Sequence, residues 1–174
     1  MKTINVFTIN ELTETVQNKV IDKYSDINVN DSFWYESIID NDAKEIGLLI
    51  SSFDIDRRDI KGIFKETAFE TACLIKKEHG EICDTYKTAD NYLTNYDIEF
   101  KQFEDKDRKG RCDESKEDAF DEWLSNWESE FLNDILQDYL KIFKDEYEYL
   151  TSKDAIKETL LSNEYLFTEN GQLV

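Results

Sequence analysis

Few side chains in this 174-residue sequence have the types and spacing that enzyme chemistry needs. His79 and Cys83 are four residues apart and could meet on a helix as a base and a nucleophile. Gly80 lies between them and favours a turn, so a surface histidine beside an inert thiol is the simpler interpretation. The sequence also lacks a glycine-rich phosphate-binding loop. We therefore expect a protein that is not an enzyme.

The many carboxylates raise the question of a metal site. The sequence has no calcium-binding loop of the D-x-[DN]-x-[DN]-G type, and one histidine is too few for the paired Glu-x-x-His of a di-iron bundle. Glu99 and Lys101 match the E-x-K pattern of restriction-like nucleases, in which an upstream aspartate, Asp84 or Asp90, would share a magnesium ion. A nuclease also needs a basic surface for DNA, so this is our third hypothesis, and we expect neither a metal nor a cofactor.

Acidic residues dominate the composition, with 40 Asp and Glu against 21 Lys and Arg and a formal net charge of −19. Binding to phosphates needs clustered basic residues, so we expect no direct contact with nucleic acid or with an anionic membrane. No apolar run approaches the ~20 residues of a membrane span, and the first residues lack a signal-peptide core, which predicts a cytoplasmic protein. The complementary partner is a basic protein surface.

The negative charge is concentrated in residues 113–138, which contain ten acidic residues and one basic residue. Like charges three or four positions apart on a helix lie about 5–6 Å from each other, a spacing similar to that of phosphates along a nucleic-acid strand. We therefore expect an acidic row that binds a partner by imitating a nucleic-acid backbone, and plain solvation of an exposed helix is the open alternative. The predicted partner-binding residues are Glu114, Asp118, Asp121, Glu122, Glu128, Asp134 and Asp138.

The elements that would position this row are predicted from hydrophobic periodicity. The pattern favours an α+β fold in a single domain, residues 1–174, in which several helices pack with a small antiparallel sheet. A long helix near residues 115–150 carries the acidic row on the side opposite its aromatic face. Shorter helices are predicted over residues 8–23, 31–50, 86–103 and 153–161. Charged connections are predicted over residues 54–61 and 104–113.

Strands are predicted near residues 3–7, 60–64 and 69–75, followed by a C-terminal hairpin over residues 165–174. The segment from residue 65 to residue 79 is ambiguous, because Phe69, Cys73 and Ile75 fit the alternation of a strand while Ala68 and Ala72 have helical spacing. We favour the strand.

Residues 3–24, 34–47 and 163–171 together resemble a group of small phage and prophage proteins, some of which are labelled antitoxin-like. Members tend to carry a glycine-rich pair of strands, F-x-G-F and G-D-G-A-x-F, which corresponds here to residues 61–64 and 71–74 without the G-D-G. The resemblance implies a phage accessory protein that works in the cytoplasm of a bacterial host, and it supports the strand at residues 69–75.

The acidic row and the resemblance together predict an inhibitor of the anti-CRISPR type. It would bind the basic groove of a host defence enzyme, a CRISPR-Cas or other nuclease, and block access of DNA or RNA. The alternative is an antitoxin that neutralises a basic toxin, and the magnesium-dependent nuclease is the third hypothesis. The sequence does not indicate an oligomeric state.

Overall fold

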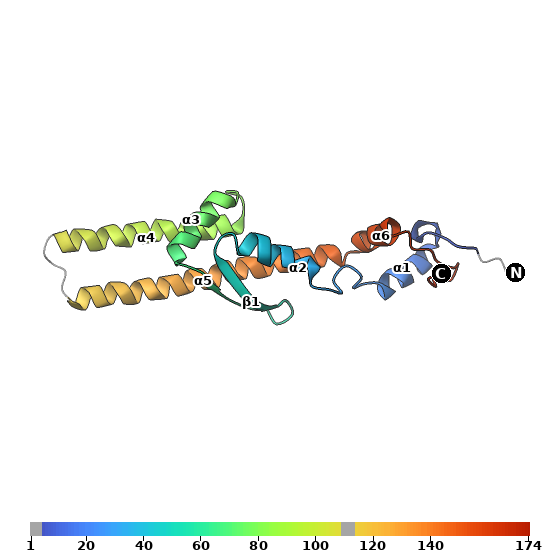
Figure 1. The fold of residues 1–174 in the computed structure, drawn as a ribbon, viewed down its shortest axis with the longest axis horizontal. Coiled ribbons are helices and arrows are strands. Elements are labelled where there is room, and N and C mark those ends of the chain that lie inside the picture. The colour runs from blue at the N-terminus through green and yellow to red at the C-terminus, as the bar shows by residue number, and fades with distance from the viewer. Residues whose placement is uncertain (1–4, 109–113) are drawn as a thin grey trace. The chain divides into compact units, whose positions relative to one another are not determined.

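We describe the fold from a computed structural model, which covers the backbone of residues 5–108 and 114–174. Side chains are described for these residues except residues 104–108 and 114–117. This described part forms six α-helices and a two-stranded antiparallel sheet, which confirms the α+β class (Figure 1). The chain divides into two compact units. The terminal unit comprises Met1–Tyr35 and Lys144–Val174, and the central unit comprises Glu36–Phe143.

The terminal unit contains a 3-10 turn, η1 (Ile9–Glu11), and two helices, α1 (Glu14–Lys23) and α6 (Lys153–Ser162). The Glu11 carboxylate accepts a hydrogen bond of 2.7 Å from the backbone N–H of Thr8, as the T-x-x-E pattern predicts. This capping box caps the 3-10 turn η1 and not an α-helix, so α1 begins later than predicted, at Glu14. Seven buried side chains form the core of the unit: Ile9, Leu12, Val20, Ile21, Ile156, Leu160 and Phe167.

Two predicted strands of the terminal unit are reduced to isolated bridges. Phe7 pairs with Phe167 through backbone hydrogen bonds of 2.8 Å in both directions, and Phe167 also bridges Leu173. The strand predicted near residues 3–7 is wrong where the structure describes it, because the extended segment ends at the cap of η1 and leaves room for one pairing only. The predicted C-terminal hairpin is a tight turn at Gly171, whose φ is +79°.

The central unit begins with the end of α2 (Phe33–Ser37) and a π-helix, η2 (Ile38–Ala43), and continues into a hairpin of β1 (Leu48–Asp54) and β2 (Asp59–Phe64). The register runs from Leu48 opposite Phe64 to Asp54 opposite Asp59, with an irregularity between Ile50 and Ser52. β2 confirms the predicted strand at residues 60–64. β1 corrects the prediction of a helix to residue 50, because Gly47, at φ +81°, ends the helical segment before the apolar run.

The strand predicted at residues 69–75 is wrong, because this segment lies in a helix, α3 (Ala68–Glu78). Thr67 caps its first turn: the Thr67 hydroxyl accepts a hydrogen bond from the Glu70 N–H, and the Glu70 carboxylate accepts one from the Thr67 N–H. The buried residues Ala68, Ala72 and Ile75 have helical spacing. The helical pattern of this segment is therefore the one that the structure follows, and the strand-like alternation of Phe69, Cys73 and Ile75 is not.

Two long helices complete the central unit and confirm the strongest periodic patterns: α4 (Asp84–Arg108) and α5 (Glu114–Leu150), the last residues of which belong to the terminal unit. The connection predicted over residues 104–113 begins later than expected, because α4 continues to Arg108, and its residues 109–113 lie outside the described part.

β2 lies close against α5 at Gly62. A Cβ atom added there would be 2.8 Å from the Leu49 carbonyl oxygen and 3.0 Å from Cδ2 of Leu136. On either side of this contact, Phe64 stacks on Phe131 at 5.4 Å and Phe53 stacks on Phe143 at 4.2 Å between ring centroids. The hairpin therefore packs on α5 through rings, with a glycine at the point of closest approach.

We expect Gly62→Ala to lower the free energy of unfolding by about 1–3 kcal/mol, because the new methyl group must displace backbone or a packed leucine. Urea unfolding followed by circular dichroism measures the change. Gly80→Ala is the control, since its Cβ would meet nothing nearer than Cys83 Sγ at 4.0 Å. Equal unfolding midpoints for the two variants would contradict the close packing at Gly62.

Candidate functional site

The orientation of α5 in the central unit is set by a ladder of rings that it shares with α4. Tyr92 stacks on Phe131 at 4.3 Å, and Phe103 stacks on Phe120 at 4.5 Å between ring centroids. Phe103, near the end of α4, contacts Phe120, near the start of α5, whereas Tyr92, earlier in α4, contacts Phe131, later in α5. The two helices therefore run antiparallel (Figure 1). The aromatic face of α5 thus points at α4, and exposed acidic residues such as Asp118, Asp121 and Glu122 lie on other sides of the helix.

The predicted acidic row does not form one continuous line. Asp118 and Asp134 are sixteen residues apart, which places them about 160° apart around a helix of 3.6 residues per turn. Asp118, Asp121, Glu122 and Asp134 are exposed, whereas Glu128 and Asp138 are half-buried. The side chain of Glu114 lies outside the described residues.

Four of the predicted residues share one side of α5, and we refer to them as the acidic stripe: Asp118, Asp121, Glu122 and Glu128. Asp121 and Glu128 are two turns apart, so they lie nearly in line along the helix. No lysine or arginine pairs with the stripe among the side chains that the structure describes. Several acidic residues elsewhere in the central unit have a lysine partner: Asp40 with Lys44, Asp90 with Lys76, and Asp84 with Lys87 and Lys141. Among the described side chains, the stripe therefore has no basic partner.

Glu128 differs from the rest of the stripe because it is half-buried. Burial raises the pKa of its carboxyl group, and within the described part of the chain no hydrogen-bond donor compensates it. The neighbouring Tyr92 is 1% exposed, and its hydroxyl group also has no hydrogen-bond partner. The pKa of Tyr92 is raised, first by burial and then by the charge of Glu128.

Asp138 belongs to the packing between helices. The Thr88 hydroxyl on α4 donates a hydrogen bond of 2.7 Å to Asp138 Oδ2. Burial raises the pKa of Asp138, and this hydrogen bond opposes the shift. Asp138 is therefore a predicted site residue whose acidic side chain is explained by a contact between helices.

The residues of the nuclease hypothesis are not brought together. Asp84, Glu99 and Lys101 all lie on α4, and Asp84 and Glu99 are fifteen residues apart, which is about 22 Å along a helix axis. Two carboxylates at that separation cannot share a magnesium ion. The described side chains contain no group of three or more histidine, cysteine or acidic residues that could hold a metal ion.

A polar network that the sequence did not predict connects four segments of the central unit. The Tyr139 hydroxyl donates a hydrogen bond of 2.6 Å to Asp42 Oδ2, and His79 Nε2 lies 3.6 Å from Asp42 Oδ1. His79 Nδ1 shares a hydrogen bond of 2.7 Å with Thr85 Oγ1, and Cys83 is exposed. The order Thr–His–Asp resembles an activated nucleophile, but Thr85 is 3% exposed, so its oxygen is closed to a substrate.

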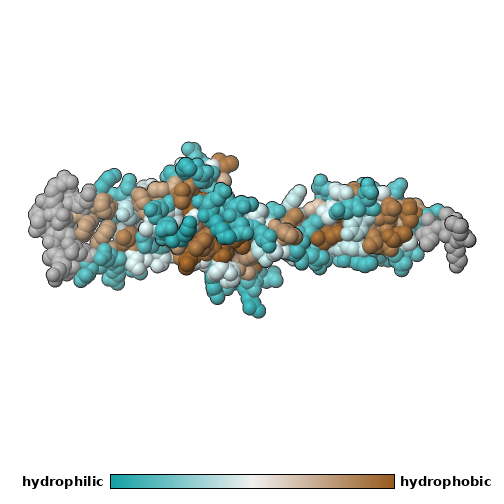
Figure 2. Space-filling model, in the orientation of Figure 1, coloured by the Kyte–Doolittle hydropathy of each residue, from teal (hydrophilic) through white to brown (hydrophobic). Residues whose placement is uncertain are grey.

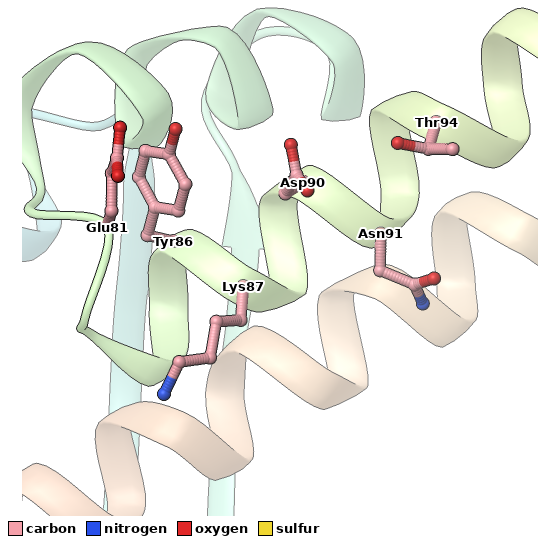
Figure 3. A pocket seen from close by; sticks show the side chains of 6 residues that line it. All are labelled: Glu81, Tyr86, Lys87, Asp90, Asn91 and Thr94. Carbon is pink, nitrogen blue, oxygen red and sulfur yellow. The ribbon is translucent and has the colours of Figure 1, made fainter.

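The hollow shown in Figure 3 lies on the outer side of α4 and has a volume of about 620 Å³. Tyr86 and Asp90 point to one side of it, whereas Lys87 and Asn91 point to the other. Ligand sites usually present converging polar groups in an enclosed apolar cavity. This open hollow with diverging side chains is therefore a weaker candidate than the acidic stripe.

Comparison of the chain with models of protein families, with curated proteins and with solved structures finds no match. Within the described residues, no helix has the length and apolar character needed to cross a membrane. A functional proposal therefore starts from the geometry of the central unit.

We expect Tyr139→Phe to lower the free energy of unfolding by about 1.5–3 kcal/mol, because the Asp42 carboxylate loses a donor from a buried side chain. Tyr149→Phe is the matched control, since Tyr149 is 61% exposed, and we expect it to change the stability by less than about 0.5 kcal/mol. Thermal and urea unfolding measure both variants. A Tyr139→Phe protein as stable as the control would show that the network contributes little.

The half-buried carboxylate of Glu128 predicts a pH-dependent stability. Its folded-state pKa is raised above the unfolded value, so its favourable contribution is complete below the unfolded pKa and is lost as pH rises through the folded pKa. We therefore expect Glu128→Gln to gain stability relative to the wild type as the pH rises above about 4, near the unfolded pKa of glutamate. Glu122→Gln, at an exposed position, should show no such gain when urea unfolding is measured across this range. Parallel curves for the two variants would contradict the burial of Glu128.

Proposed function

We propose that this protein binds the basic groove of a nucleic-acid-binding protein through the acidic stripe and so blocks the access of DNA or RNA. The observation that carries the proposal is the contrast in ion pairing. Lysines neutralise acidic residues on η2 and at the start of α4, whereas no described basic side chain pairs with Asp118, Asp121 or Glu122. Carboxylates without a described basic partner can form ion pairs with a basic protein surface.

The spacing within the stripe supports a groove that normally holds phosphates. Asp118, Asp121 and Glu122 lie three and four residues apart on α5, which separates neighbouring side chains by about 5–6 Å. A rigid helix presents these charges without further ordering, so binding costs little conformational entropy. Electrostatic steering would make association fast and strongly dependent on salt.

The class of partner that we propose is a host defence nuclease, such as a CRISPR-associated enzyme. This step is supported by the resemblance of residues 3–24, 34–47 and 163–171 to small phage proteins and by the acidic composition. A nuclease groove is basic because it must hold a nucleic-acid backbone, which makes it complementary to the stripe.

The test reverses the charge of the stripe with Asp118→Lys, Asp121→Lys and Glu122→Lys in one variant. We expect capture of the partner enzyme from host lysate by the immobilised protein to fall by more than about tenfold, because attraction becomes repulsion. Captured enzyme is then assayed for nucleic-acid binding with and without added wild-type protein. We expect the wild-type protein to prevent this binding at low salt and to lose the effect at high salt.

The control reverses three exposed acidic residues of the terminal unit, Asp22→Lys, Asp26→Lys and Glu158→Lys, which changes the net charge by the same amount. Circular dichroism checks that both variants fold. Equal loss of capture in both variants would mean that overall charge, and not the stripe, binds the partner. Capture of an enzyme that still binds nucleic acid would contradict the blocking mechanism.

A further inference from the structure

A row of three aromatic rings, two of them exposed, connects α3 and α4 in the central unit. Phe69 lies 5.0 Å from Tyr96, and Tyr96 stacks on Phe100 at 5.8 Å with ring planes 8° apart. Phe69 is 39% exposed and Phe100 is 38% exposed. We refer to these three residues as the aromatic row. Hydrophobic surface lies among hydrophilic surface on the visible face of the central unit (Figure 2).

The aromatic row lies beside the half-buried end of the acidic stripe. Tyr92 is in ring contact with Tyr96 at 6.2 Å, and it stacks on Trp127 and Phe131 of α5, which precede and follow Glu128 in the sequence. Glu128 and the row are therefore neighbours around one buried phenol. That phenol oxygen has no hydrogen-bond partner in the described part of the chain, which leaves two polar groups without compensation at the edge of an aromatic surface.

We infer that the aromatic row and Glu128 together form a site for arginine side chains of the basic partner, an inference that rests on the proposed function. The guanidinium group would stack on an exposed ring of the row and donate hydrogen bonds to the Glu128 carboxylate. Arginine fits this surface better than lysine, because its guanidinium group is planar, carries five donors and is less strongly hydrated than an ammonium group.

The chain itself contains the same combination of ring, carboxylate and cation. The Lys76 ammonium group lies 4.4 Å from the centroid of the Tyr86 ring and is paired with Asp90. At Glu128 the ring and the carboxylate are present, and no described lysine or arginine occupies them. Charge complementarity therefore selects a cationic occupant.

Other occupants fit the charge less well. A second copy of this chain carries the same net charge of −19, so association through the stripe would be opposed by repulsion. An anionic membrane surface is repelled for the same reason. A basic protein segment that contains arginine is the occupant that satisfies both the rings and the carboxylate.

The test measures binding of two fluorescent peptides of equal length, an oligo-arginine and an oligo-lysine, by fluorescence anisotropy at low salt. We expect the full-length protein to bind the oligo-arginine about fivefold more tightly than the oligo-lysine. Phe69→Leu with Phe100→Leu keeps the apolar bulk and removes the rings, so we expect this variant to lose the preference while its affinity for oligo-lysine stays the same.

Phe33→Leu is the matched control, because Phe33 is a more exposed ring, at 74%, in the terminal unit, and we expect it to keep the preference. Glu128→Gln should weaken binding of oligo-arginine more than binding of oligo-lysine. Equal affinity of the wild type for both peptides, or a preference that survives loss of both rings, would overturn the inference. If charge reversal of the stripe still abolishes capture, those outcomes contradict the arginine site and leave the proposed function standing. Failure of both peptides to bind would contradict both the arginine site and the proposed function.

Discussion

The ring of Phe131 is the contact on which the arrangement of the central unit depends. It is 3% exposed and stacks on Tyr92 of α4 and on Phe64 of β2, so a single residue of α5 holds a helix and a sheet. This double contact fixes the rotation of α5 about its own axis. Rings nearer the start of α5 repeat the contact with α4, and the residues that α5 presents to solvent follow from that rotation.

Fixing this rotation divides the acidic residues into two kinds. Asp138 faces α4 and is held by Thr88, whereas Asp118 and Asp121 face solvent without a described basic partner. Glu128 lies between these cases, because the rotation half-buries its carboxylate and no donor among the described residues compensates it. A half-buried carboxylate without a described donor costs stability, so Glu128 differs in kind from the exposed acids of the stripe.

Sequence periodicity was sufficient for the long elements and insufficient for the short ones. The helix near residues 115–150 repeats its apolar pattern over many turns, so its period is clear, whereas Asn91, Asn95 and Asp97 weaken the pattern of the helix near residues 86–103. The short segment at residues 69–75 fits both periods, and the deciding signal was the capping box of Thr67 and Glu70. The network of Asp42, His79 and Tyr139 has no signal in the sequence, since tertiary packing alone brings these distant residues together.

The two parts of the candidate surface act over different distances. Charges on exposed side chains are screened within roughly 10 Å at moderate salt, and an exposed ion pair contributes about 1 kcal/mol or less. The exposed acids of the stripe can therefore attract a basic groove without selecting one among several. Selection requires contacts that exclude water, and Glu128 beside the rings of Phe69 and Phe100 is where this chain offers them. In the proposed function, attraction by the exposed acids and recognition by the rings beside Glu128 involve separate residues, and substitutions should be able to change one without the other.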